Sequence, residues 1–171
     1  MKMLTEKTCS EWLATKSVPQ APYSQRKRAV PFYEQVKLPA EALRQTAVAR
    51  QLVASCEPFG SALLQFTDWP FYKPDEMAVL CGLHTLHGDS RPMIESPGHV
   101  FDVAERDLLI GMLSLAMHYG YSAYVYFDHG ATLLCWEGGM LDFWCSDELR
   151  ATEVRRVLRT HAPSSSESAD A

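Results

Sequence analysis

Three short segments late in the chain limit what it can fold into, because each is typical of a β-strand and the connections are very short. They cover residues 121–127, 131–136 and 140–145 and are rich in aromatic and β-branched side chains. Parallel neighbours in a sheet need a connection of about a dozen residues or more. Only three residues separate each pair of segments, so the sequence predicts an antiparallel meander.

The region before and after this meander predicts helices that pack against it. Three signals indicate these helices: apolar side chains at helical spacing, proline or acidic residues at the start, and an almost entirely apolar stretch before Gly120. Asp102, with Glu105 three residues on, forms a capping-box pattern. We expect helices at residues 39–56, 74–86 and 108–119, and a last one capped by Ser146. With a further strand at 61–67, the fold class is α+β: an antiparallel sheet of about four strands with helices packed on it.

The chain divides into three parts by composition. Residues 1–37 contain three prolines and the basic cluster Arg26-Lys27-Arg28, and we expect a loosely ordered basic arm. Residues 38–161 should form a single α+β domain, since 171 residues suit one domain. Residues 162–171 have no large apolar side chain and predict a disordered tail.

Charge is distributed unevenly along the sequence. Residues 51–149 carry a net charge of −11, residues 1–50 carry +5 and residues 150–171 carry +1. An acidic body repels nucleic acid and attracts basic proteins, so we expect a basic protein partner and no nucleic acid. The alternative is that the basic first segment folds back over the acidic surface. Because no run approaches 18 consecutive apolar residues, we expect no membrane span.

The cysteines indicate a reducing compartment. There are five of them, an odd number, at Cys9, Cys56, Cys81, Cys135 and Cys145, with no CxxC pair. Widely spaced single cysteines favour free thiols over a disulfide framework. The first residues also lack the apolar stretch of a secretory signal. We therefore expect a cytoplasmic protein, and the sequence leaves its oligomeric state open.

One cluster could bind a metal. Cys81 and His84 stand three residues apart in the expected helix, as do His84 and His87, and His99 is a distant fourth candidate. Thiolate and imidazole suit zinc. The alternative is a packed cysteine with surface histidines, because Cys81 and His87 lie about 120° apart around a helix. We expect no cofactor and no complete catalytic site, while a metal- or thiol-dependent enzyme using these four residues remains an alternative function.

A second group of residues suggests a binding surface on the meander. Trp136 and Trp144 lie near Glu137, Asp142 and Asp147. Alternation turns Asp142 away from its two apolar neighbours and towards solvent. Tryptophan anchors bordered by charge are typical of protein interfaces. The alternative is that both tryptophans belong to the core.

The order of short motifs also carries a resemblance. Trp69-Pro70, Gly88-Asp89-Ser90-Arg91 and Pro97-Gly98-His99-Val100-Phe101 precede a buried helix and a meander. Over residues 59–149 the chain resembles small uncharacterised bacterial α+β proteins, and it departs from them at Gly120-Tyr121-Ser122, where they have Gly-Trp-Asp. The resemblance implies the fold class and a bacterial source, and no site residue.

Together these observations favour a small acidic protein-binding module. An immunity- or antitoxin-type inhibitor of a basic partner is the specific form we expect, because acidic inhibitors associate rapidly with basic targets. The other alternative is a non-catalytic scaffold or regulatory subunit.

Overall fold

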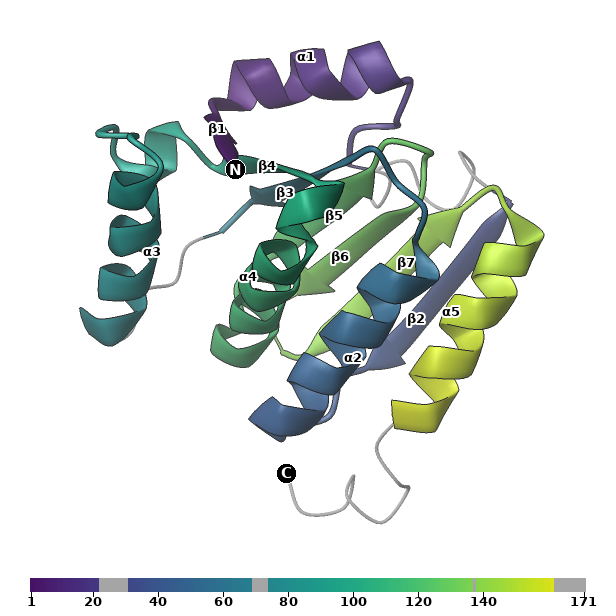
Figure 1. Ribbon diagram of the computed structural model, residues 1–171. Helices are drawn as coiled ribbons and strands as arrows, with labels where there is room; N and C mark the ends of the chain where they lie inside the picture. The colour runs from purple at the N-terminus through teal and green to yellow at the C-terminus, as the bar shows by residue number, and fades with distance from the viewer. Residues whose placement is uncertain (22–30, 69–73, 137, 162–171) are drawn as a thin grey trace.

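A computed structural model describes residues 1–21, 31–68, 74–136 and 138–161 (Figure 1). Its centre is one antiparallel sheet of seven strands in the order β1-β4-β3-β5-β6-β7-β2. The strands are β1 (Lys2–Leu4), β2 (Phe32–Lys37), β3 (Ser61–Phe66), β4 (Gly98–Asp102), β5 (Ala123–Phe127), β6 (Thr132–Trp136) and β7 (Met140–Cys145). The α-helices are α1 (Glu6–Lys16), α2 (Ala42–Ser55), α3 (Pro74–Leu86), α4 (Arg106–Tyr119) and α5 (Glu148–His161), and the short 3-10 helices η2 (Met93–Glu95) and η3 (Val103–Glu105) flank β4.

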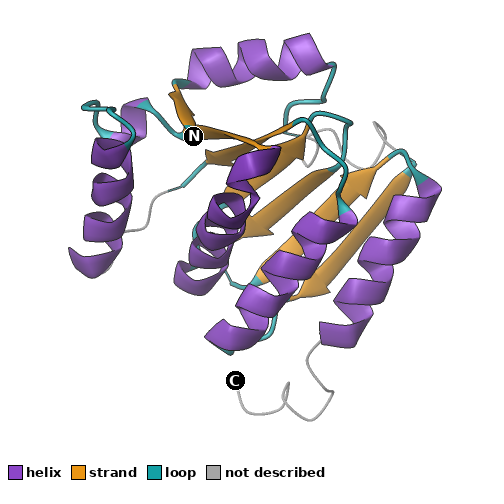
Figure 2. Cartoon of the chain, in the orientation of Figure 1, coloured by secondary structure: helices purple, strands orange, loops and turns teal. Residues whose placement is uncertain are grey.

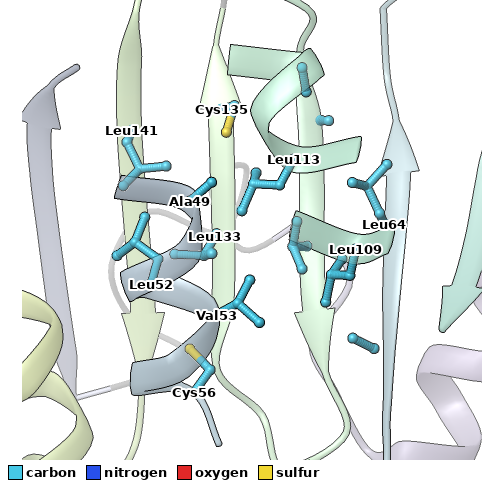
Figure 3. Close-up of a cluster of buried hydrophobic side chains, with 14 of the residues drawn as sticks. Ala49, Leu52, Val53, Cys56, Leu64, Leu109, Leu113, Leu133, Cys135 and Leu141 are labelled. Carbon is cyan, nitrogen blue, oxygen red and sulfur yellow. The ribbon is translucent and has the colours of Figure 1, made fainter. Parts of the chain in front are cut away.

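Helices α2, α4 and α5 lie side by side over one face of the sheet (Figure 2). They cover the main core, in which α2 and α4 place Leu52, Val53 and Leu113 against Leu133 and Leu141 of the strands (Figure 3). These side chains are inaccessible to solvent. Burying each of them contributes about 1.5–3 kcal/mol relative to exposure, so the three-helix layer fixes the position of the sheet.

The opposite face of the sheet holds a second core. Strand residues that alternate with those of the main core, such as Leu63 and Tyr126, pack there with Cys9 and Leu13 of α1. Helix α1 approaches β4 at Gly98, where an added Cβ atom would lie 2.1 Å from the Cys9 sulfur. A glycine at this position therefore allows the close contact between α1 and the sheet.

Several predictions are confirmed. The class is α+β, and the meander of β5, β6 and β7 is antiparallel. The capping box of Asp102 and Glu105 is present, although it starts η3, which runs directly into α4. Gly120 ends α4 with φ 72°. The last helix is capped differently from our expectation: Asp147, rather than Ser146, accepts hydrogen bonds from the backbone N–H groups of Leu149 and Arg150.

The predicted sheet of about four strands is wrong, because the sheet has seven. Strand β4 was not among the predicted strands, and β1 and β2 come from the expected arm. Residues 1–21 and 31–37 are therefore not loosely ordered. Thr5 caps α1 by accepting a hydrogen bond from the Thr8 N–H, and β1 and β2 form the two outer strands of the sheet.

The remaining organisational predictions concern other parts of the chain. The basic cluster at residues 26–28 and the tail at 162–171 lie outside the described residues. Within the described residues, no helix is both long and apolar enough to cross a membrane.

Candidate functional site

The predicted binding residues on the meander do not form one exposed surface. Asp142 does turn away from Leu141 and Phe143, but its side chain is fully buried on the face that also carries α1. The expectation that it points to solvent is therefore wrong, because both faces of the sheet are covered at this strand. Trp144 is only 1% exposed and belongs to the same core.

Asp142 instead forms the centre of a polar network. Its carboxylate accepts a hydrogen bond from the Tyr33 hydroxyl at 2.5 Å and another from the Trp136 indole N–H. The Tyr33 and Trp144 rings lie 5.4 Å apart. Two neutral donors thus satisfy a carboxylate that would otherwise be costly to bury, and the network links β2, β6 and β7.

The other members of the predicted patch are separated. Trp136, which is half-buried, ends β6 opposite Met140. Asp147 follows the other end of β7, is exposed and caps α5; its hydrogen bonds to the Arg150 and Leu149 N–H groups lower its pKa. Glu137 lies outside the described residues. A role in binding stays a prediction for Trp136 and Asp147, which cannot act as neighbours.

The structure joins two of the four candidate metal ligands. His84, on the buried side of α3, and His99, on β4, place their Nε2 atoms 3.0 Å apart. Cys81 and His87 are exposed. Among the described residues, no group of three or more His, Cys, Asp or Glu side chains could hold a metal ion. The His84–His99 contact is therefore a pair rather than the four-ligand site that the spacing suggested.

Burial keeps this histidine pair neutral. His99 is inaccessible to solvent and His84 is 3% exposed. Burial, and then the neighbouring His84, lowers the pKa of His99 from 6.5 to about 3. Burial also lowers the pKa of His84, although the Asp89 carboxylate opposes that shift. Two neutral imidazoles can share one proton between their Nε2 atoms, so the contact is a hydrogen bond between α3 and the sheet.

The buried thiols are poorly suited to nucleophilic chemistry. Burial raises the pKa of Cys9, Cys56 and Cys135 to about 12, and it also raises the pKa of Cys145. The thiolate is the reactive form of cysteine. Because a raised pKa keeps these four side chains protonated, they are poor nucleophiles. Cys81 is the one exposed cysteine, and it has no histidine partner among the contacts described above.

Helix α3 is the surface feature that our sequence analysis missed. After Glu76 it contains no charged residue in the order Met-Ala-Val-Leu-Cys-Gly-Leu-His-Thr-Leu, and such a helix is normally buried on most sides. Among the side chains of α3 whose burial the structure describes, only Leu80 and His84 are buried. In Figure 1, α3 stands beyond the sheet and apart from the layer of α2, α4 and α5.

Four large apolar side chains are exposed around this helix. Met77 is 45%, Val79 46% and Leu86 82% exposed, and Ile94 of the adjoining η2 is 78% exposed. We call these four residues the α3 surface. The absence of charge along α3 was the sequence signal that could have identified it, because a helix on the outside of a domain usually has a polar face.

Comparison of the chain with protein-family models, with curated proteins and with solved structures found no match.

Proposed function

We propose that this chain is a small acidic protein-binding module, whose α3 surface docks a partner protein that has an apolar face bordered by basic side chains. The observation that carries the proposal is the exposure of large apolar side chains on a helix that has no charged residue after Glu76. Val79 and Leu86 lie on the same side of α3 at 100° per residue, and Met77 lies on the opposite side. Neighbouring exposed apolar side chains mark interaction sites more often than isolated ones do. Leu86 and Ile94 would contribute most of the newly buried apolar area, since they are the most exposed of the four.

The charge around the α3 surface supports a basic partner. Residues 68–95 contain five acidic and two basic side chains. Asp75, at the start of α3, and Glu95, next to Ile94, are both exposed. An apolar contact with an acidic border favours fast association with a basic surface, because the long-range field attracts it. An immunity- or antitoxin-type inhibitor is the specific form of this function that the charge favours.

A comparison of two double variants, each of which replaces two exposed apolar side chains by serine, tests the proposal. The double variant L86S/I94S removes the exposed apolar side chains of the α3 surface. The control L43S/L149S removes two equally exposed leucines from the starts of α2 and α5. Both variants should keep the wild-type melting temperature, because exposed side chains contribute little to the core. Tagged protein from the native host should capture a basic partner with the wild-type and control chains, and lose it with L86S/I94S.

The kinetics of the captured complex test the charge argument separately. Replacing Asp75 and Glu95 by lysine should slow association and weaken its dependence on salt, with a smaller effect on dissociation. L86S/I94S should mainly speed dissociation, as the loss of buried apolar contacts does. Equal capture of the partner by the wild-type chain, L43S/L149S and L86S/I94S would contradict the proposed surface. An association rate that neither salt nor the lysine variants change would contradict the basic partner.

A further inference from the structure

Helix α3 is held in place by the buried histidine pair, by Leu80 of the main core and by a hydrogen bond from Tyr119 to Asp75. We propose that the His84–His99 contact is an acid-sensitive latch that holds α3 against the sheet and releases it when both rings are protonated. The regulatory consequence rests on the proposed function, because the released helix would no longer present the α3 surface in its docking arrangement. The latch itself is a property of the free chain.

The geometry makes the contact dependent on protonation. At 3.0 Å, one Nε2 atom must donate and the other must accept. A second proton on the pair removes the acceptor and places two positive charges at that distance. The His99 ring packs against the Phe66 ring of β3 in a T-shaped arrangement, at 5.6 Å between centroids, so this wall of the site is aromatic. Because the pair is buried, protonated rings would lose most of their hydration there.

The charged groups around the pair only partly offset the cost of a doubly protonated contact. Asp89 and Arg91, in the loop after α3, are the neighbours that act on His84, and Asp89 also acts on His99. Arg91 already forms two hydrogen bonds with the Asp89 carboxylate, at 2.6 and 2.9 Å. The backbone carbonyls of Pro97 and Leu64 favour protonation of His99, but burial outweighs them. The Asp89 carboxylate is therefore occupied when the rings begin to take up protons.

The sign of the pH dependence follows from these shifts. Both histidines have a lowered pKa in the docked state and regain the ordinary value of 6.5 when α3 is released. The docked state is fully favoured above pH 6.5, and its advantage falls as the pH drops below that value. If neither ring takes up a proton while docked, the ratio of docked to released α3 falls about 100-fold between pH 7.5 and 5.5. One such histidine alone would give about tenfold.

Hydrogen exchange of the full chain, without a partner, tests the latch. Mass spectrometry would compare the protection of residues 74–86 with that of strands β5, β6 and β7 at pH 7.5 and 5.5, after correction for intrinsic exchange. We expect α3 to lose protection by more than about tenfold and at most about 100-fold, while the strands stay within about twofold. H87Q removes an exposed histidine near the same helix and is the matched control. It should respond like wild type, whereas H99Q should show no more than about a tenfold response.

Three results would overturn the latch. They are equal α3 protection at both pH values, parallel loss in the strands, and an H87Q response reduced as much as that of H99Q. If H99Q does not fold, histidine NMR of the wild-type chain decides, because titration of His84 and His99 near pH 6.5 with α3 still protected would refute the latch. The hydrogen-exchange test contains no partner protein. The capture experiment with L86S/I94S therefore tests only the proposed function, and its outcome does not affect the test of the latch.

Discussion

Replacing Gly98 by alanine tests how closely α1 packs on the sheet. The added Cβ atom would lie 2.1 Å from the Cys9 sulfur and 3.2 Å from both the Leu4 Cβ and Leu63 Cδ1 atoms. Apolar atoms prefer separations of about 3.5–4.0 Å, so α1 must move outward by more than 1 Å, on the order of the missing separation. Overpacking of this kind costs about 1–3 kcal/mol, and we expect the upper end because three side chains oppose the new methyl group.

Urea unfolding followed by tryptophan fluorescence measures this effect. A loss of about 3 kcal/mol would lower the unfolding midpoint and reduce Tm by about 6–12 °C for a chain of this size. G111A is the matched control, because a Cβ at this exposed position of α4 would meet nothing within 4 Å. It should increase stability by about 0.5–1 kcal/mol through the higher helix propensity of alanine.

A second substitution tests whether the loss of stability in G98A comes from the contact with Cys9. C9A removes the sulfur that the new Cβ would contact, so the double variant G98A/C9A should be more stable than the sum of the single effects by about 1–2 kcal/mol. Additive effects of the two substitutions, or a G98A variant as stable as wild type, would refute the proposed packing of α1 on β4.

Three further predictions concern buried and capping groups. D142N should lower the free energy of unfolding by about 1–3 kcal/mol in urea titrations, since it replaces one of the two acceptor oxygens of a fully buried carboxylate by an NH2 group that cannot accept a hydrogen bond. Native chain should show one rapidly reacting thiol with a disulfide reagent at pH 8, assigned to Cys81 by its loss in C81S, because the other four cysteines are buried. D147A should lower Tm at neutral pH by removing the cap of α5. Because the pKa of Asp147 is lowered, this difference should disappear as the pH falls below 3.8, and calorimetry at several pH values would detect it.

The local sequence pattern predicted those helices and strands whose formation depends on their own residues. The meander follows from its short connections, and α4 follows from an apolar stretch that ends at Gly120. Strand β4 could not be predicted in this way, because Gly98 and Asp102 are unfavourable in strands and its stability comes from pairing with β1 and β3. The same limit applies to β1, which has only three residues.

The candidate site was predictable in its residues but not in its arrangement. Alternation placed Asp142 on the correct face of β7, yet whether that face is covered depends on segments distant in sequence. His84 and His99 were both identified, but as metal ligands with Cys81 and His87. Their pairing depends on how α3 meets β4, and this information is absent from the spacing of residues within one helix.

The order of strands has a consequence for the synthesis of the chain. Strand β2 pairs with β7 through Phe32 and Cys145 at one end of its register, so its partner is translated more than a hundred residues later. At about 5–20 residues per second, a nascent β2 waits about 5 to 20 seconds before it can join the sheet. Strand β1 waits similarly for β4. Both outer strands therefore precede their partners in synthesis and pair late, and unpaired strand edges of this kind make a partly folded chain prone to aggregation.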